Sequence, residues 1–391
     1  MRRRHFLAAS AATALQLRAS ARYRVGVIGH TGRGNFGHGI GDVWSVFPQA
    51  EVVAVADPDP EGRAAAKDRT GASRAYADYR ELLAAEKPDI VSICPRHTDQ
   101  RLEMVTAAAE AGCHMYLEKP FAGSLTDADR MSAAIRKAGV KVQLAHQMRM
   151  SPFTIKALEL IEGGEIGEIH EVRGRGKEDF RAGGEDLVVL GSHIFDMMRA
   201  VLGDPEWVFA HITSGGAELA FDHLRKPNEP IGPVAGREMA AMFSFGQGRH
   251  AYFATKRSSS THPFRFGTHV YGAKGRIFLP NQIYTPESDG YLLRSPAWIA
   301  GKGREWEPIE PHHRSFGEQR YVTANGLMVE DLLDAIESDR EPVCSERAGR
   351  WTVEMMQGMY ASQLERAVKD FPLEVRSHPL EALRAAGPGT G

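Results

Sequence analysis

Residues Tyr23–Gly34 read YRVGVIGHTGRG, an apolar segment that runs directly into a glycine-rich loop. The first seven residues are rich in Val and Ile and end in glycine, which is typical of a buried strand. Glycine at positions 29, 32 and 34 lets the backbone turn tightly and approach a pyrophosphate, and we expect a helix from about Gly37 to Val46 to follow. Thr31 takes the place of the middle glycine in the G-x-G-x-x-G pattern, so a plain turn between strand and helix is the alternative.

Strands and helices alternate after this loop. Further apolar strands are expected over 51–57, 89–94, 114–118 and 140–145, with helices near 60–70, 78–86, 98–111 and 124–138. Strands that are apolar along their whole length and alternate with helices indicate a parallel sheet covered on both faces. Residues 22–147 are therefore predicted to form a Rossmann-type NAD(P)-binding domain.

The pattern changes after Arg149. We expect a helix over 152–161, strands over 167–176, 206–214, 238–246, 250–257, 264–272 and 275–279, a hairpin at Gly246–Arg249, and late helices over 322–338 and 346–368. Successive strands without helices between them favour antiparallel pairing. The expected fold class is α/β: the Rossmann parallel sheet, then a C-terminal α/β substrate and oligomerisation domain over 148–376 with a large, mainly antiparallel open sheet. Residues 377–391 are expected to form a loose tail.

The composition excludes several classes of partner. The chain has 391 residues, 42% of them hydrophobic, which suits two domains of ~100–200 residues each. The net charge of −2 does not favour nucleic acid. No apolar run reaches the ~18 residues of a membrane span. The three cysteines, Cys94, Cys113 and Cys344, show neither a disulfide framework nor a metal-binding spacing, so we predict no metal site.

The N-terminus has the order of an export signal. Arginines at positions 2–4 precede Phe6-Leu7, a weakly apolar stretch follows over 8–17, and Ala19-Ser20-Ala21 offers a cleavage site. The Arg-Arg-x-Phe-Leu pattern is similar to a twin-arginine signal. We therefore assign residues 1–21 to a signal segment and expect export, to the periplasm. The alternative is a disordered basic N-terminus on a cytoplasmic protein.

Asp57 is the candidate that selects the cofactor. It ends the second strand, 28 residues after Gly29. A carboxylate there accepts hydrogen bonds from the adenosine ribose and repels a 2′-phosphate. Pro58 and Asp59 follow with no adjacent Arg or Lys, which favours NAD over NADP. The alternative role for Asp57 is a turn residue before proline.

Lys119 and His193 are the catalytic candidates. Glu118-Lys119-Pro120 stands at the carboxyl end of a predicted parallel strand, where ligands of such sheets bind. The ammonium could polarise a substrate oxygen or relay a proton; the alternative is a surface salt bridge with Glu118. His193 and Asp196 are three residues apart on a predicted helix and share a face, so Asp196 could orient an acid/base histidine. The alternative is a capping or core histidine.

Two further segments carry charge. The loop 174–181 could line a polar pocket, although a solvated loop is the more usual role for such a sequence. His312-His313-Arg314 is left unassigned.

With these residues in place, the chain resembles the glucose–fructose oxidoreductase/inositol dehydrogenase (Gfo/Idh/MocA) family. The marks of the resemblance come in the family's order: Val27-Ile28-Gly29, Val55-Ala56-Asp57, Cys94-Pro95-Arg96-His97, Glu118-Lys119-Pro120, Gly164-Glu165-Ile166-Gly167, Gly191-Ser192-His193 with Asp196, and Tyr271-Gly272-Ala273-Lys274-Gly275. The resemblance implies NAD(P)-dependent oxidation or reduction of sugars, cyclitols and related polyols. It also implies an open sheet whose outer face supports a homo-oligomer.

The resemblance assigns roles to single residues. Lys119 and His193 match the catalytic pair, and Lys119 also touches the nicotinamide ribose. Arg149 and Asp196 match positions near the substrate. The implied cofactor contacts are Gly29, Thr31, Gly32, Arg33, Gly34, Asp57, Pro95, Glu118 and Lys119.

One position departs from the family. Its dehydrogenases commonly carry Asp four residues before the histidine, where this chain has Val189, and Asp186 lies on another phase of the chain. Valine cannot move protons, so either Lys119 and His193 suffice or the chemistry differs. An exported enzyme would also have to retain its NAD tightly, because the free cofactor is scarce outside the cytoplasm.

Three functions follow. The first is an oxidoreductase that acts on a carbohydrate or polyol. The second is an NAD-dependent glycoside-cleaving enzyme that oxidises its substrate transiently. The third is a non-catalytic sugar-binding protein, against which Lys119 and His193 argue.

Overall fold

The computed structural model describes residues 23–256, 266–280, 290–295, 306–312, 315–317 and 321–387. The predicted signal segment over 1–21, and His313 and Arg314, lie outside the described residues. None of the helices in these ranges is long and apolar enough to cross a membrane.

The first sheet is the predicted Rossmann sheet. Its six strands are all parallel, in the order β3-β2-β1-β4-β5-β6. They are β1 (Tyr23–Ile28), β2 (Ala50–Ala56), β3 (Arg74–Tyr76), β4 (Ile90–Ile93), β5 (His114–Leu117) and β6 (Val142–Leu144). The strand order reverses between β1 and β4, and ligands of such sheets bind at the carboxyl end of this switch point. The structure confirms the expected fold class, with β3 as an additional short strand.

Helices cover this sheet as the sequence pattern predicted. They are α2 (Pro60–Thr70), α3 (Tyr79–Glu86), α4 (Arg101–Glu110) and α5 (Leu125–Ala138). The Ser124 hydroxyl caps α5 by accepting a hydrogen bond from the Asp127 amide, and Gly139, with a φ of 67°, ends it.

The predicted helix over 37–46 is wrong. Turns run through this segment, and only a 3₁₀ helix, η1 (Val43–Val46), forms at its end. The cause is the glycine content: Gly32, Gly34, Gly37 and Gly39 take φ values between 63° and 91°. A left-handed backbone cannot continue an α-helix. The structure therefore has no α-helix N-terminus directly behind the glycine loop.

The second sheet is large and mainly antiparallel, as predicted. Its order is β17-β16-β15-β14-β7-β13-β12-β8-β18, with β9 beside β8, and only the β13–β7 pair is parallel. The predicted hairpin joins β12 and β13, where Ser244 pairs with His250. The strands are β7 (Ile169–Arg175), β8 (Trp207–Ser214), β9 (Ala217–Glu218), β12 (Glu238–Ser244), β13 (His250–Lys256), β14 (Gly267–Gly272), β15 (Arg276–Pro280), β16 (Tyr291–Leu293), β17 (Glu307–Pro308) and β18 (Lys369–Asp370). A separate ribbon pairs β10 (Leu224–Arg225) with β11 (Val234–Ala235).

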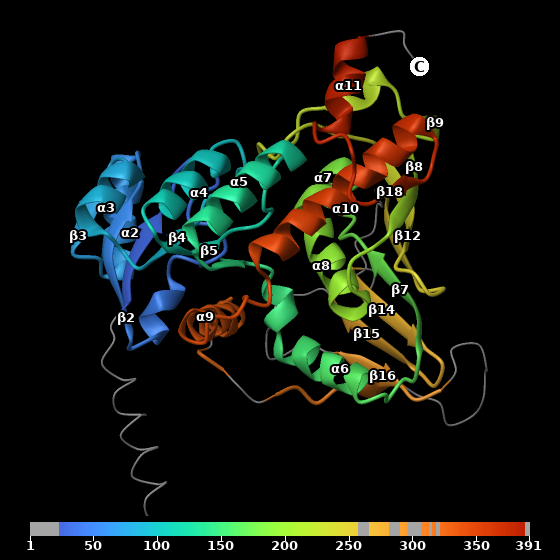
Figure 1. Ribbon diagram of the computed structural model, residues 1–391, viewed down its shortest axis with the longest axis horizontal. Helices are drawn as coiled ribbons and strands as arrows, with labels where there is room; N and C mark the ends of the chain where they lie inside the picture. The colour runs from blue at the N-terminus through green and yellow to red at the C-terminus, as the bar shows by residue number, and fades with distance from the viewer. Residues whose placement is uncertain are drawn as a thin grey trace, which may run out of the picture.

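The helices that follow the first sheet in the chain include α6 (Pro152–Glu162), α7 (Gly184–Val189), α8 (Gly191–Leu202), α9 (Val322–Glu337) and α10 (Glu346–Glu365). Of these, α6, α8 and α10 pack against strands of the second sheet. Helix α10 packs against β8 and α8 on one side and α5 on the other (Figure 1). Helix α9 packs against η1, β6 and the 3₁₀ helix η2 (Gln147–Met150).

Side-chain hydrogen bonds attach α9 to the Rossmann sheet. The Tyr116 hydroxyl donates to Asn325 Oδ1 at 2.7 Å, and Gln143 Nε2 donates to Asp331 Oδ2 at 2.9 Å. Helix α9 is therefore part of the packing of the first sheet, whereas α10 contacts strands of both sheets.

The expected loose tail is also wrong in part. Helix α11 (Pro379–Ala386) forms there, capped by the side chain of His378, with Pro379 at its first position. Leu380 and Leu383, three residues apart, are buried, and α11 packs against α10. Burial of this apolar pair orders a segment that the polar residues around it did not reveal.

Candidate active site

A cavity of about 200 Å³ opens at the carboxyl ends of β1 and β2. Gly29 and His30 line one side, and Asp57 lies at the end of β2. Its apolar lining includes Ala56, Pro58, Ala77 and Met104. An apolar slot beside a carboxylate at a strand end suits the adenosine part of a dinucleotide.

Asp57 is buried and fastens the glycine loop. Its carboxylate accepts hydrogen bonds from the Thr31 amide at 3.0 Å, the Thr31 hydroxyl at 2.8 Å and the Asp59 amide at 2.9 Å. Thr31, which departs from the glycine pattern, therefore has a definite partner. A carboxylate has about four acceptor sites, so Asp57 can combine this role with a contact to a ribose hydroxyl.

The glycine loop leaves room for a ligand, but its amides have partners within the chain. A Cβ on Gly32 would meet nothing within 4 Å. The Gly32 amide donates to Asn35 Oδ1 at 2.9 Å, and Arg33 forms an ion pair with Asp99. The residues present thus fit the adenosine half of NAD directly. Phosphate oxygens would replace the partners of the Thr31 and Gly32 amides.

Glu118 is a buried carboxylate at the end of β5. It forms an ion pair with His38 Nδ1, and its Oε2 accepts from the Lys119 amide at 3.1 Å. Burial alone would raise the pKa of Glu118, but the charge and hydrogen bond of His38, followed by the charges of Lys119 and Arg101, hold it below its usual value.

Lys119 is also buried, and its side chain does not form the surface salt bridge considered above. Its Nζ donates to the backbone carbonyl of Val189 at 3.0 Å. Burial lowers the pKa of Lys119, and the negative charges of Glu118 and Glu229 only partly oppose this shift. At the position where the family resemblance implies an aspartate, this chain therefore offers Lys119 the neutral carbonyl oxygen of Val189.

His193 lies in the first turn of α8 and is buried. Burial, followed by the positive charge of Lys119 and the neighbouring His146, holds the pKa of His193 well below its usual value. Its Nδ1 has no hydrogen-bond partner within the described ranges. A neutral imidazole in this position can accept a proton.

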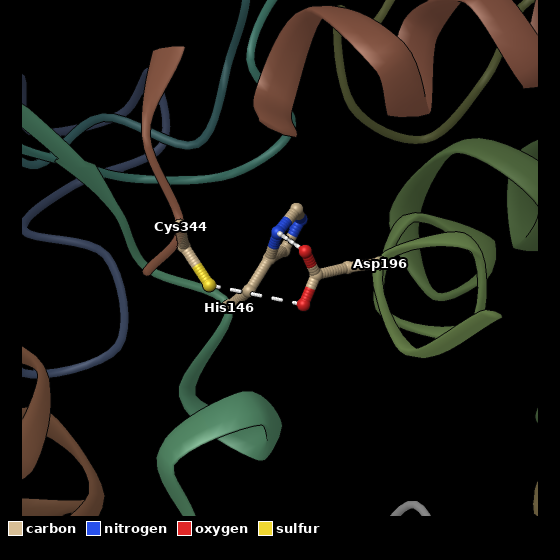
Figure 2. Close-up of side chains that lie close together, drawn as sticks. All are labelled: His146, Asp196 and Cys344. Carbon is tan, nitrogen blue, oxygen red and sulfur yellow. Dashed lines mark hydrogen bonds and ion pairs between the residues drawn. The ribbon is translucent and has the colours of Figure 1, made fainter. Parts of the chain in front are cut away.

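Asp196 does not orient His193, so that prediction is wrong. Its Oδ2 lies 3.4 Å from Arg149 Nη1. Its Oδ1 lies 3.7 Å from His146 Nδ1, as Figure 2 shows. The His193 ring instead stands edge-on to the His146 ring, with 5.3 Å between centroids. Arg149, Asp196 and His146 form one group, next to the predicted catalytic pair.

The other sequence candidates fold away from this centre. Asp186 accepts hydrogen bonds from the Lys177 and Glu178 amides and from the Thr255 hydroxyl. Asp186 and Val189 both lie on α7, three residues apart, so the expected difference in phase is not seen. The carboxylate of Asp186 is instead occupied by these three donors. His312 is bonded to Glu159 at 2.8 Å on the surface.

Arg101 was not among the site residues predicted from the sequence. This residue is buried, and its guanidinium donates to the carbonyl oxygens of Pro95, Glu118 and Pro120. It thereby joins the two strand-end loops that carry the predicted cofactor contacts Pro95 and Glu118. An arginine in the first turn of a helix gives no sequence signal for burial, because most such residues face solvent. His146 was missed too, although its place at the end of β6 could have indicated it.

Comparisons with known proteins agree with this architecture. Residues 23–146 match the profile of an oxidoreductase family with an NAD-binding Rossmann fold, and residues 154–278 match the Gfo/Idh/MocA C-terminal domain. The chain is 28% identical over 267 residues to myo-inositol 2-dehydrogenase of Thermotoga maritima, which covers 66% of this chain and 75% of that protein.

Solved structures show the same fold. A levoglucosan dehydrogenase in complex with NADH and levoglucosan has a TM-score of 0.72 at 20% identity, covering 90% of this chain and 100% of that one. An aldose-aldose oxidoreductase from Caulobacter crescentus complexed with glycerol has a TM-score of 0.70 at 18% identity, with 90% and 100% coverage.

The fold and the site define an oxidoreductase with an NAD-binding Rossmann domain. The chain belongs to the Gfo/Idh/MocA family. The resemblance stated from Glu118-Lys119-Pro120 and its companion motifs is thereby confirmed.

Proposed function

We propose that the protein is an NAD-dependent dehydrogenase of a sugar, cyclitol or related polyol. The observation that carries the proposal is the convergence of two buried groups, the Lys119 ammonium and the His193 imidazole, beside Val189 at the carboxyl edge of the NAD-binding sheet. The names of its relatives, which include myo-inositol 2-dehydrogenase, support this class of substrate.

The residues have separate tasks in this proposal. NAD, when bound, supplies the hydride acceptor. Asp57 holds the adenosine ribose, and Pro95 and Glu118 border the path to the nicotinamide. His193 takes the proton of the reacting hydroxyl. Lys119 gives one N–H to Val189 and has donors left for the substrate oxygen, whose negative charge its ammonium stabilises.

Arg149 and Asp196 are proposed to border the substrate. Arg149 Nη1 also contacts the Asp196 backbone carbonyl at 3.2 Å, so its guanidinium is fixed beside α8. A fixed guanidinium can donate to ring hydroxyls without losing much side-chain freedom.

The test is to add polyols and aldoses to the NAD-loaded protein and record reduced-nicotinamide absorbance. A lasting signal with at least one cyclitol or aldose is expected. The second candidate, glycoside cleavage through transient oxidation, is favoured by the missing carboxylate at Val189. It predicts sugar release from a glycoside with no net NADH, and this outcome would overturn net dehydrogenation.

Cofactor choice gives the first mutational prediction. Wild-type protein should bind NAD at least tenfold more tightly than NADP, about 1.4 kcal/mol, because the Asp57 charge repels a 2′-phosphate. Asp57→Asn keeps an oxygen for Thr31 and should reduce this preference to near unity. Asp59→Asn, which alters a neighbouring carboxylate that caps α2, is the matched control. Equal wild-type affinities, measured by calorimetry, would refute the role of Asp57.

The pH profile of kcat/KM gives the second prediction. Since burial lowers the pKa of Lys119 from 10.5, its ammonium is lost at lower pH than in free lysine. We expect kcat/KM for oxidation to fall as pH rises, with a midpoint below 10.5. Lys119→Arg should lack this fall, because its guanidinium stays charged. A midpoint at or above 10.5, or the same fall in Lys119→Arg, contradicts the assignment; circular dichroism controls for unfolding.

We also propose a homo-oligomer formed through the outer face of the second sheet. Phe209 is 45% and Tyr252 37% exposed there, and Arg173 lies over the Tyr252 and Tyr271 rings. Exposed aromatic and arginine side chains on one face are typical of interfaces. Tyr252→Glu should lower the mass measured by light scattering to that of the monomer, whereas Val375→Glu, at an exposed site elsewhere, should not. A monomeric wild-type protein would refute the proposed homo-oligomer.

We further propose export through the twin-arginine signal over residues 1–21 with NAD tightly bound. The support is the Arg-Arg-x-Phe-Leu pattern. Arg2→Lys with Arg3→Lys and Arg4→Lys should leave the protein in the cytoplasm on cell fractionation. NAD released from the exported wild-type protein only after denaturation would support retention.

A further inference from the structure

Three side chains of different donor type meet near the carboxyl end of β6: His146, Asp196 and Cys344. One nitrogen, one oxygen and one sulfur atom from these residues lie within 4.8 Å of one another. Figure 2 shows the side chains pointing toward a common centre from the β6–η2 junction, from α8 and from the segment before α10. The distances are 3.7 Å between His146 Nδ1 and Asp196 Oδ1, and 3.7 Å between Cys344 Sγ and Asp196 Oδ2.

Three polar atoms at this centre lack hydrogen-bond partners among the described residues. Both ring nitrogens of His146 and the Oδ1 atom of Asp196 are buried without one in the part of the chain that the structure describes. Leaving a buried polar atom without a partner destabilises the folded chain. A neutral imidazole carries one lone pair on its ring nitrogens, so one His146 nitrogen and Asp196 Oδ1 are left to bind a ligand at this centre.

The backbone holds two of the side chains in position. The Cys344 amide donates to Gln143 Oε1 at 3.0 Å, and its carbonyl accepts from the Leu144 amide at 2.8 Å. The His146 amide donates to the Leu144 carbonyl at 2.7 Å. Cys344 and His146 are thus both fixed to the end of β6, and preorganisation of this kind favours metal coordination.

The donor set selects the kind of ion. Thiolate, imidazole and carboxylate ligands suit Zn²⁺ and similar transition metals, whereas Mg²⁺ and Ca²⁺ prefer oxygen ligands alone. Tetrahedral zinc sites with three protein ligands keep a fourth position for water or substrate. Arg149 Nη1 contacts the Oδ2 atom of Asp196, which leaves Oδ1 for an ion.

We propose that His146, Asp196 and Cys344 bind one divalent transition-metal ion of the zinc type. On binding, the Cys344 thiol loses its proton to solvent and its sulfur bonds to the metal, while a His146 nitrogen and an Asp196 oxygen each donate an electron pair. The ion neutralises the thiolate and carboxylate charges. Because the His146 ring is edge-on to His193, the metal centre would lie one side chain from the proposed base.

The test uses the full chain expressed with Co²⁺ in zinc-depleted medium, so that the metal is present while the protein folds. We expect about one cobalt per chain by elemental analysis and a thiolate-to-cobalt charge-transfer band in the near ultraviolet. Cys344→Ser should abolish the band and weaken metal binding on the order of 100-fold, at least as much as the loss of an outer-sphere partner does.

Cys113→Ser is the matched control, because Cys113 is also buried but its Sγ contacts the Pro88 carbonyl, away from this centre. It should keep both the cobalt and the band. Asp196→Asn, which preserves side-chain shape, should weaken binding if Cys344→Ser does not fold. A wild-type protein that folds without bound cobalt would overturn the proposal, as would a band that survives in Cys344→Ser.

Discussion

Lys119→Ala is expected to lower kcat/KM on the order of 10²–10⁴-fold, because the variant loses the only ammonium bonded next to the proposed base in the described site. Charge that develops on the substrate oxygen in the transition state would lose the ammonium that stabilises it. Steady-state kinetics with the substrate found in the nicotinamide assay measures the loss.

The fold should survive this change. The Lys119 side chain makes one hydrogen bond, to the Val189 carbonyl, and removing a buried cation offsets its loss. Lys119→Met, which preserves the length of the side chain, should show the same kinetic defect without a cavity. Lys156→Ala, on an exposed helix face beside Glu159, is the control and should retain full activity. Full activity in Lys119→Ala would refute the catalytic assignment.

Arg101→Ala is expected to destabilise the protein by about 3–5 kcal/mol, because three buried carbonyl oxygens lose their donor. Burial lowers the pKa of Arg101 to about 10, so the guanidinium is still charged at neutral pH and donates strongly. Urea unfolding followed by circular dichroism measures the change. Arg101→Lys should recover little of it, because a single ammonium cannot reproduce the planar fork.

Arg80→Ala provides the comparison. Arg80 is an exposed arginine on α3 paired with Glu103, and its loss should change stability by no more than about 0.5 kcal/mol. NAD binding should weaken in Arg101→Ala, since the Pro95 and Glu118 loops lose their common anchor. A destabilisation below about 1 kcal/mol would show that water satisfies these carbonyls instead.

The strands were the predictable part of this fold, for a physical reason. Each strand of a parallel sheet is buried on both faces, so an apolar run such as Val52–Ala56 carries its own signal. In the second sheet, the alternation of side chains between the two faces made the strands predictable. Val208, Ala210 and Ile212 are buried in β8, whereas Phe209 and His211 are exposed.

The helix predicted after the glycine loop does not form, because a glycine-rich sequence allows two backbone conformations. Glycine permits both a tight turn into a helix and a run of left-handed turns, and the contacts of His38 with Glu118 and Asn325 accompany the second. These partners are far away in sequence. Helix α11 was missed because two buried leucines among polar residues form a weak pattern.

The site was predictable at strand ends and not beyond them. Asp57 and Lys119 were found because each follows a strand whose carboxyl end forms the ligand edge. The partners of Asp196 could not be predicted in this way. Helical spacing places His193 on the same face as Asp196, but it cannot show that His146 and Arg149 contact the Asp196 carboxylate. Such contacts between distant residues arise only in the folded chain.

The hydrogen bonds of α9 limit how this enzyme can be recombined. Asn325 accepts from Tyr116 and Gln147 and donates to the carbonyl of His38, so one residue of α9 joins β5, η2 and the turns that follow the glycine loop. A chimera that exchanges only residues 22–147 would leave Asn325 facing residues from another protein in place of Tyr116, Gln147 and His38. Exchange of the whole N-terminal domain therefore means transplanting α9 with it, as one discontinuous module.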